Sequence, residues 1–405
     1  MGRSRLPLAI VVAVAAATAA TFLLRPRSGL IEPAPVEAEQ YFTPLQIERA
    51  EDFRGLQEIL GLAGLGVGIA TLVVLVWRPP RRVLERLEGR PLLGGAAAGA
   101  GIALLLVVTG LPIRAWMRSR SLDVGLATQS WPDWAVDVLK AAGIGAVTAA
   151  IGGLVAVALI RRFPRNWWAP GAVLLVAYGV ITIWLYPVVI DPVFNKFEPL
   201  RPGPLRHDVL ELAEQTGVDV GEVYRVDASR RTSAANAYVN GLGHSKRVVL
   251  YDNLIDDFPP DEVRVVVAHE LGHQKHDDLL RGLAWLALVA PAGTFLTQVL
   301  TERFAGSRRP RRAGAAILPA VALAVTLAGL GLGCASNALS RQVEATADSF
   351  ALDLTRDPDD FIRFERRITV RNVADPDPPR LLHLLFDTHP TTLERIGAGE
   401  AWPQR

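Results

Sequence analysis

Seven long stretches of the chain are almost entirely hydrophobic, and polar segments separate them. The stretches are Leu6–Leu24, Ile59–Trp77, Leu92–Pro112, Trp134–Ile160, Trp167–Ile190, Leu280–Leu300 and Ala313–Cys334. Most reach the ~20 residues that a helix needs to cross a bilayer, whereas buried helices of a soluble protein give runs of roughly 10–14 residues. Several end in arginine and tryptophan clusters, such as "WRPPRR" from Trp77, which are typical of a membrane interface. The pattern therefore predicts a mainly α protein with seven membrane-spanning helices.

The first hydrophobic stretch has two interpretations. Arg3 and Arg5 precede it, as basic residues precede the core of a secretory signal peptide. Its length and the following "RPRSG" favour an anchor that stays in the protein, and we count it as the first span.

Two polar regions interrupt the hydrophobic runs and suggest the domain organisation. We expect five spans in residues 1–190, one polar region at 191–279, two further spans in 280–334 and a second polar region at 335–405. A hairpin of the last two spans would return both polar regions to the same side of the membrane. They could then pack together as one domain.

The first polar region mixes helices with short strands. "PLRHDVLELAEQTGV" has helical spacing, and Gly217 suits its C-terminal cap. "EVYRVDAS" alternates like a strand, and "ANAYVNGLGHSKRVVLYDNLI" predicts two strands joined as a hairpin through "NGLGHS". "PPDEVRVVVAHELGHQKHDDLL" predicts one continuous helix, because Pro260 suits the first turn and the acidic residues after it complement the helix dipole.

Composition narrows the possible functions. Half of the 405 residues are hydrophobic and the mean hydropathy is +0.25, which agrees with a membrane protein. The net charge of +2 gives no indication of nucleic-acid binding. The single cysteine, Cys334, excludes an intramolecular disulfide and a cysteine-based zinc site. Only four of the 43 basic residues are lysine, and this arginine bias suggests a GC-rich bacterial genome and hence a bacterial plasma membrane.

The clearest indication of chemistry is "VVVAHELGHQKHDD". His269 and His273 lie four residues apart, so on a helix both imidazoles face the same way and can bind one metal ion. Glu270 is adjacent and can reach a metal-bound water without binding the metal, which is the arrangement of zinc proteases. An apolar helix carries the motif, which favours a metal site over an ordinary charged turn.

A catalytic zinc needs a third protein ligand. The metzincin pattern would place glycine and histidine where this chain has His276 and Leu279, so that class is excluded. The second polar region offers "SRQVEATADSFAL", in which Glu344 and Asp348 share one helical face. One carboxylate can bind the metal while the other holds a metal-binding imidazole.

Five stretches together resemble the type I CAAX prenyl protease family, the membrane zinc metallopeptidases related to HtpX. They are "DPVFNKFEPL", "SAANAYVNGLGHSKRVVLYDNLI", "VVAHELGHQKHDD", "SRQVEATADSFAL" and "THPTTLERI". The resemblance implies a gluzincin-like protease domain with a small β-sheet. It also implies that His269, His273 and Glu344 bind one zinc ion and that Glu270 is the catalytic base.

The resemblance implies four further roles. Asp348 corresponds to an aspartate that supports the metal ligands, and Asn236 to a position that holds the substrate backbone. His389 matches a histidine near the metal that can stabilise the oxyanion. Arg395 matches a nearby basic position, which we expect to bind substrate.

The predicted function is that of an integral-membrane zinc endopeptidase. Its substrates would be extended peptides or membrane proteins, and its role CAAX protease-like or quality control. Prenylated substrates are not expected in a bacterium, so the family name does not by itself give the activity. The alternative is a membrane binding or scaffold protein with a vestigial metal site, which would not depend on Glu270. A transporter would need paired charges inside the spans, and few are present.

Two indications of membrane orientation disagree. The arginine-rich segments "RPPRRVLERLEGR", "RRFPR" and "TERFAGSRRPRR" follow the second, fourth and sixth runs. The positive-inside rule places them in the cytoplasm and the zinc domain outside, although Arg114–Arg120 weakens the contrast. The resemblance implies a cytosolic zinc domain instead. The oligomeric state is not indicated.

Overall fold

The computed structural model describes residues 5–241, 246–306 and 314–404. Seven of the described helices are long and hydrophobic enough to cross a membrane, which confirms the predicted number of spans. They are α1 (Arg5–Leu24), α3 (Pro44–Trp77), α5 (Pro91–Asp123), α6 (Trp131–Arg162), α7 (Trp168–Leu185), α12 (Asp278–Ala305) and α13 (Leu318–Thr355). The fifth span continues from α7 through the π-helix η1 (Tyr186–Ile190) and α8 (Asp191–Phe194).

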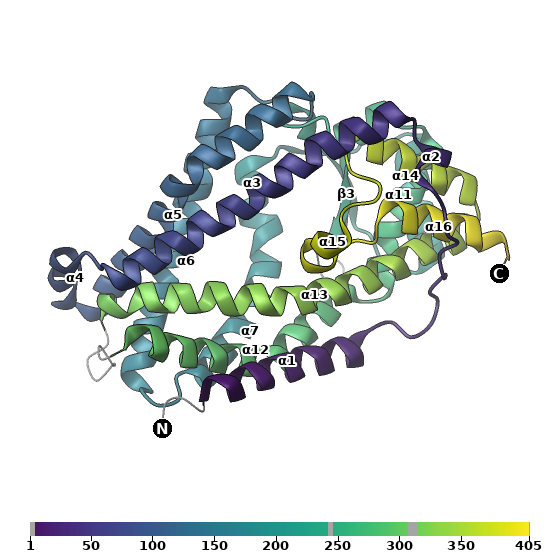
Figure 1. Ribbon diagram of the computed structural model, residues 1–405. Coiled ribbons are helices and arrows are strands. Elements are labelled where there is room, and N and C mark those ends of the chain that lie inside the picture. Colours follow the sequence, from purple (N-terminus) through teal and green to yellow (C-terminus); the bar gives the residue numbers. More distant parts are fainter. Residues whose placement is uncertain (1–4, 242–245, 307–313, 405) are drawn as a thin grey trace.

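Six of the spans form a ring (Figure 1). Each packs against the next in the order α3, α5, α6, α7, α12 and α13, and α13 packs back against α3. Small residues allow the closest approach, between α5 and α6, where a Cβ at Gly99 would collide with the carbonyl oxygen of Ala149. The first span, α1, lies against α12 and α13, and Trp285 Nε1 donates to Thr21 Oγ1 over 3.0 Å.

Several spans are longer than a bilayer requires. α3 has 34 residues and α13 has 38, or about 50 Å and 57 Å of helix against a hydrocarbon core of about 30 Å. α13 therefore leaves the hydrophobic belt as an unbroken helix. Its C-terminal half carries "SRQVEATADSFAL" into the polar part of the molecule.

The polar part, here called the extramembrane domain, combines both polar regions. Its mixed sheet has the order β1 (Phe197–Pro199), β2 (Glu222–Val226), β4 (Arg247–Tyr251) and β3 (Ala237–Asn240). Strands β2 and β4 are parallel, and the other two pairs are antiparallel. Its main helices are α9 (Pro204–Thr216), α10 (Asp252–Asp257), α11 (Pro260–Lys275), α14 (Pro358–Arg371), α15 (Arg380–Phe386) and α16 (Thr392–Ala401).

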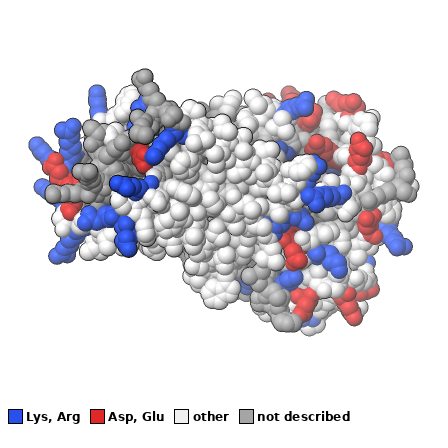
Figure 2. Space-filling model, turned by 90° about the horizontal axis from the view of Figure 1, so that it is seen from below, with Lys and Arg blue, Asp and Glu red and all other residues white. Residues whose placement is uncertain are grey.

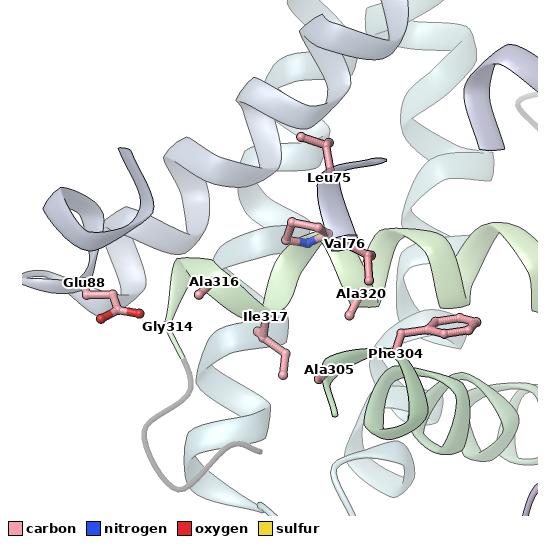
Figure 3. A pocket seen from close by; sticks show the side chains of 10 residues that line it. Leu75, Val76, Glu88, Phe304, Ala305, Gly314, Ala316, Ile317 and Ala320 are labelled. Atoms are coloured by element: carbon pink, nitrogen blue, oxygen red, sulfur yellow. The ribbon is translucent and has the colours of Figure 1, made fainter. Parts of the chain in front are cut away.

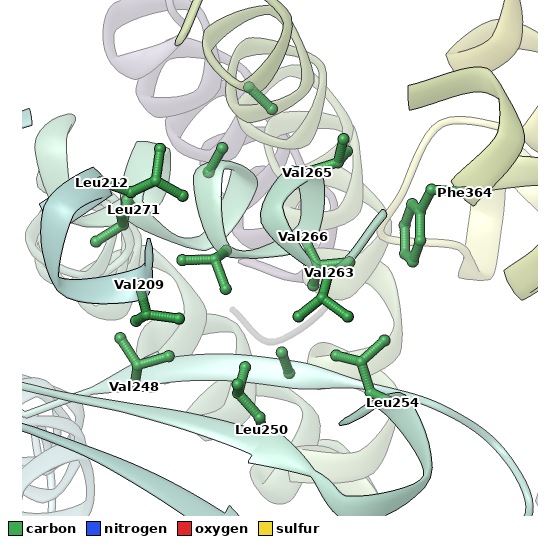
Figure 4. Packing of buried hydrophobic residues seen from close by; sticks show 14 of the residues in the cluster. Val209, Leu212, Val248, Leu250, Leu254, Val263, Val265, Val266, Leu271 and Phe364 are labelled. Atoms are coloured by element: carbon green, nitrogen blue, oxygen red, sulfur yellow. The ribbon is translucent and has the colours of Figure 1, made fainter. Parts of the chain in front are cut away.

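One hydrophobic core holds this domain together (Figure 4). Helix α11 lies over the sheet and packs its valines and Leu271 against Val248 and Leu250 of β4. Leu352 of α13 and Phe361 of α14, from the second polar region, belong to the same cluster. The core therefore fixes α11 and α13 relative to each other.

Most of the predicted elements of the first polar region are confirmed. α9 ends at Thr216, and Gly217 caps it in the left-handed conformation with φ 69°. Strand β2 matches "EVYRV", and β3 pairs with β4 as the predicted hairpin, from Ala237↔Leu250 to Asn240↔Arg247. Residues 242–245 of the predicted "NGLGHS" connection lie outside the described residues.

The prediction of one helix through "HDDLL" is wrong. α11 ends at Lys275, Asp277 adopts a left-handed conformation with φ 52°, and α12 begins at Asp278. Aspartate tolerates this conformation better than most residues, because its short polar side chain can bond locally. The break turns the chain from the core helix α11 into the membrane span α12.

A separate small cavity lies at the end of the helix ring that is farther from the extramembrane domain (Figure 3). Its volume is about 190 Å³, and it lies where the ends of α3 and α12 meet η4 (Ala315–Ile317) and the start of α13. Apolar side chains such as Leu75, Phe304 and Ile317 dominate its lining, and Glu88 is the charged residue among them. Among the described residues, this lining holds no set of side chains that could perform catalysis.

Candidate metal centre and active site

Three side chains converge where α11 meets α13. His269 and His273 come from α11 and Glu344 from α13, and their candidate ligand atoms lie within 4.8 Å of one another. His269 Nε2 is 3.2 Å from both Glu344 Oε2 and His273 Nε2. His273 Nε2 is 3.5 Å from the same Glu344 oxygen.

The chemistry of this cluster suits a cation. Each histidine places its Nδ1 against a carboxylate, so in the neutral imidazole the proton stays at Nδ1 and the lone pair at Nε2 faces the cluster. Glu344 Oε2 is buried, and no group of the described residues donates a hydrogen bond to it. Two imidazole nitrogens and one carboxylate oxygen form the donor set of a catalytic zinc site.

A series of buried ion pairs holds the His269 ring through its Nδ1 atom. This Nδ1 lies 2.8 Å from Asp348 Oδ1, and Asp348 is 2% exposed. Arg395 donates to both oxygens of Asp348, through Nη2 at 2.6 Å and Nε at 2.9 Å. Its Nη1 lies 2.9 Å from Glu365 Oε2, another buried carboxylate. The guanidinium of Arg395 thus holds the carboxylate of Asp348, which in turn orients His269.

A second carboxylate, that of Asp278, holds His273, and this contact was not predicted from the sequence. His273 Nδ1 lies 2.9 Å from Asp278 Oδ2, and Arg281 pairs with the other oxygen of Asp278. Asp278 is the first residue of α12, so the helix break at Asp277 creates this contact. The signal in the sequence was the second aspartate of "KHDD", which lies five residues after His273.

Replacing Asp278 with asparagine should weaken metal binding about 10–100-fold, because the amide cannot hold His273 as a carboxylate does. A competition titration with a chromophoric zinc chelator measures this. Asp277→Asn is the matched control, since Asp277 is exposed and asparagine also tolerates the left-handed conformation. Equal affinities for the two variants would contradict the assigned role.

A glycine inside the motif lets the two helices meet. A Cβ at Gly272 would lie 3.0 Å from Phe350 Cδ1 of α13, closer than side chains normally pack. Glycine is a weak helix former, so the sequence accepts a local cost at this position. Because Gly272 has no side chain, α13 lies close enough to α11 for Glu344 to reach both histidines.

Glu270 lines a cavity of about 710 Å³ beside the cluster, together with His273 and Glu344. Other walls come from Tyr186 at the end of the fifth span and from strand β3. Burial raises the pKa of Glu270, which suits a carboxylate that must accept a proton near neutral pH.

Strand β3 presents a free edge to this cavity. In the described chain it pairs with β4 on one side and has no strand on the other. Tyr251 N donates a hydrogen bond to Asn236 O across the β3–β4 pair. Along an antiparallel strand, residues alternate between bonding to the partner strand and facing away from it. The backbone groups of Val239 therefore face away from β4. The Val239 carbonyl accepts a hydrogen bond from Gln274 Nε2 of α11, over 3.3 Å.

Models of two protein families match the chain. The sequence profile of peptidase family M48 matches residues 199–402, which is half of the chain. A second profile, the CAAX prenyl protease N-terminal region with five membrane helices, matches residues 59–196. The chain belongs to peptidase family M48.

Named relatives of this M48 protein include an uncharacterized metalloprotease, YhfN, of Bacillus subtilis. The two are 32% identical over 285 residues, which cover 69% of this chain and 67% of YhfN. CAAX prenyl protease 1 of Saccharomyces cerevisiae is 33% identical over 36% of this chain and 33% of its own length. The Arabidopsis thaliana homolog is 32% identical over 54% of this chain and 53% of its own. The matches thus span about a third to a half of these two CAAX prenyl proteases.

The solved structure of Ste24p from S. mikatae shares the fold. It superposes with a TM-score of 0.72 and 20% identity, and the match covers 98% of both chains. This M48 protein is therefore a multi-pass membrane protein with the Ste24p fold.

Two predicted site residues lie close to the cluster of this M48 protein. His389, in the loop between α15 and α16, has its Nε2 3.3 Å from Glu344 Oε2. Partial desolvation lowers the pKa of His389, although its side chain is 58% exposed. Asp348 contacts His269 as described above.

The other two predicted residues make different contacts. Asn236 is exposed just before β3, outside the residues that line the cavity, and its Oδ1 accepts from the backbone N–H of Ala237. Arg395 directs its guanidinium at Asp348 and Glu365. Two further residues of the site were not predicted from the sequence. They are Gln274 of α11, which donates to the Val239 carbonyl of β3, and Glu365, which pairs with Arg395.

Metal uptake by this M48 protein should release protons. Burial by itself would lower the pKa of His269, but its hydrogen bond to Asp348 raises that pKa to about 9. Burial also opposes the effect of Asp278 and Glu344 on His273, whose pKa rises to about 10. Without metal both imidazoles therefore carry a proton on each ring nitrogen at neutral pH, and zinc must displace the Nε2 proton because it binds only the neutral form. Zinc affinity should fall as the pH is lowered from 8 to 6.

Titration calorimetry in two buffers of different ionisation enthalpy measures the protons released. A His273→Ala variant gives the background from other sites. Affinity that is independent of pH, with no proton release, would contradict the expectation.

Proposed function

We propose that this protein is an integral-membrane zinc metalloendopeptidase. One zinc ion would be held by His269, His273 and Glu344, with Glu270 as the catalytic base. The observation that carries the proposal is the convergence of two imidazoles and one carboxylate beside a half-buried glutamate, Glu270, that lines a cavity. The protease domain would combine residues 191–279 and 335–405, and residues 1–190 and 280–334 would supply the membrane helices.

The roles of the side chains follow from their positions. A zinc ion held there would supply a Lewis acid that polarises the scissile carbonyl and acidifies water. Glu270 would take the proton of the attacking water and pass it to the departing amine. His389 would donate a hydrogen bond to the oxygen that becomes negative in the transition state. Asp348 and Asp278 would keep the two histidines in their metal-binding orientation.

The free edge of β3 indicates how a substrate would bind. An extended peptide can pair with such an edge through main-chain hydrogen bonds, which do not depend on its sequence. It would replace Gln274 at the Val239 carbonyl and Glu270 at the Val239 N–H, within the cavity that Glu270 lines. Asn236, at the start of this strand, would hold the peptide backbone after a rotation of its side chain. Arg395 would act on the substrate only indirectly, through Asp348 and the metal.

We infer that the substrates are extended peptides or unfolded membrane proteins, as in quality control. A prenylated peptide is a separate possibility, which the names of the CAAX prenyl protease relatives suggest. The apolar wall from the fifth span, including Ile183 and Pro187, would accept hydrophobic side chains.

Proteolysis by the detergent-purified protein tests the proposal. The panel should contain unfolded proteins, model peptides and a farnesylated peptide with its unmodified twin, each with and without chelator, with zinc content determined throughout. We expect cleavage that chelation abolishes and zinc restores, at about one zinc per chain. Bound zinc with no cleavage of any member would favour the binding or scaffold alternative.

A further inference from the structure

The end of the helix ring farthest from the metal cluster carries a concentration of positive charge (Figure 2). Arginines gather at this end, a nearly uncharged belt follows, and mixed charges cover the extramembrane domain. We define the distal arginine surface by nine exposed residues, Arg78, Arg81, Arg82, Arg86, Arg90, Arg161, Arg162, Arg165 and Arg303. The stretches 78–90, 161–165 and 302–303, which carry these arginines, contain three acidic residues, Glu85, Glu88 and Glu302. The surface is therefore strongly cationic.

Helix α4 (Arg81–Glu88) forms the centre of this surface. Leu84 is buried and Leu87 half-buried against the helix bundle, while Arg81, Arg82 and Arg86 are exposed. None of the ion pairs found within the described residues involves these three arginines. An amphipathic helix with this division of faces lies parallel to a membrane surface.

The arginines at the other end of the spans are used differently. Arg120 donates to the carbonyl of Asp52 over 3.0 Å, and Arg49 to that of Val124 over 2.8 Å. Arg54 donates to Val373 over 2.7 Å. Arg118 is buried, bonds to the carbonyl of Gln129, and stacks against tryptophan rings. These cations serve the fold, so the sequence count of basic residues overstates the free charge at that end.

We propose that the distal arginine surface binds anionic phospholipid headgroups and is the cytoplasmic face of the protein. The surface borders the hydrophobic belt, where phosphates of one leaflet lie, and guanidinium groups pair well with phosphate. Basic residues beside spans stay on the cytoplasmic side, whose leaflet is negatively charged. The extramembrane domain then lies outside the cytoplasm, opposite to the orientation that the family resemblance implies.

Cysteine labelling tests the orientation. In a Cys334→Ser background, Gly89→Cys marks the distal surface and Gln215→Cys marks the extramembrane domain. Both positions are exposed, and a side chain at Gly89 meets nothing within 4 Å. In spheroplasts, a membrane-impermeant maleimide should label only the Gln215→Cys variant, and lysis should expose the other. Labelling of only the Gly89→Cys variant in intact spheroplasts overturns the proposal.

Lipid-dependent stability tests the headgroup contact. Phosphatidylglycerol added to the purified protein in detergent should raise its unfolding temperature more than phosphatidylcholine, and high salt should remove the difference. The Arg81→Gln, Arg82→Gln, Arg86→Gln triple variant should lose it at low salt. The control triple Arg201→Gln, Arg356→Gln, Arg380→Gln, exposed on the extramembrane domain, should keep it. Equal effects of the two lipids on wild-type protein, or an undiminished difference in the α4 triple variant, would overturn the proposed contact.

Discussion

Replacing Glu270 with glutamine should lower the rate of peptide hydrolysis about 10²–10⁴-fold while the protein keeps its zinc. The amide has nearly the shape of the carboxylate but cannot accept a proton from water. Glu270 contributes no atom to the three-residue metal cluster, so its loss should leave metal affinity unchanged. Steady-state cleavage and zinc content, measured on the same preparation, check both parts of the expectation.

Asp261→Asn is the matched control for this substitution. Asp261 lies on the same helix in its exposed first turn, far from the cavity lining, so the variant should retain nearly full activity. A Glu270→Gln variant that cleaves within threefold of wild type, with its zinc in place, would show that another group takes the proton. Loss of zinc from that variant would instead assign Glu270 to metal binding.

Local patterns were sufficient to predict the spans and two of the three residues of the candidate metal site. A run of about 20 hydrophobic residues has few stable alternatives to a membrane helix, whatever the rest of the chain does. The spacing of His269 and His273 gives a common face on any helix. Their convergence with Glu344 needed a long-range step, which the requirement for a third ligand and the family resemblance supplied.

The contact of Asp348 with His269 was predicted from the resemblance, but those of Asp278 and Glu365 could not be, because they depend on packing between distant segments. Asp277 and Asp278 are compatible with a continuing helix, and the turn into the membrane decides that α11 stops before them. Glu365 looks like an ordinary acidic residue of an amphipathic helix until α14 packs against α16. The orientation of Asn236 shows that a motif position does not determine where a side chain points.

Replacing Arg395 with methionine should destabilise the folded protein by about 3–5 kcal/mol, since removing one partner of a buried ion pair leaves charge uncompensated. The variant would leave both Asp348 and Glu365 without their cation, and each carboxylate is at most 2% exposed. Zinc affinity should fall as well, because Asp348 would hold His269 less firmly. Thermal or chemical unfolding in detergent, with a zinc titration, measures the two effects.

The destabilisation should depend on pH in a defined direction. Burial raises the pKa of Glu365 to about 7, and Arg395 opposes that rise, so without Arg395 the pKa should be higher still. A carboxyl group whose pKa is higher in the folded than in the unfolded state loses folding free energy as the pH rises between the two values. The variant should therefore be further below wild type in stability at pH 8 than at pH 6.

Two further substitutions isolate the cause. Glu365→Gln in the Arg395→Met background removes one uncompensated charge, so it should recover part of the stability and flatten its pH dependence. Arg366→Met on α14 is the control, because Arg366 is exposed, donates to the backbone carbonyl of Tyr41 and should change stability by no more than about 0.5 kcal/mol. If Arg395→Met behaves like this control, the buried guanidinium does not hold the two carboxylates. If only zinc affinity falls, Arg395 orients His269 through Asp348 without stabilising the fold.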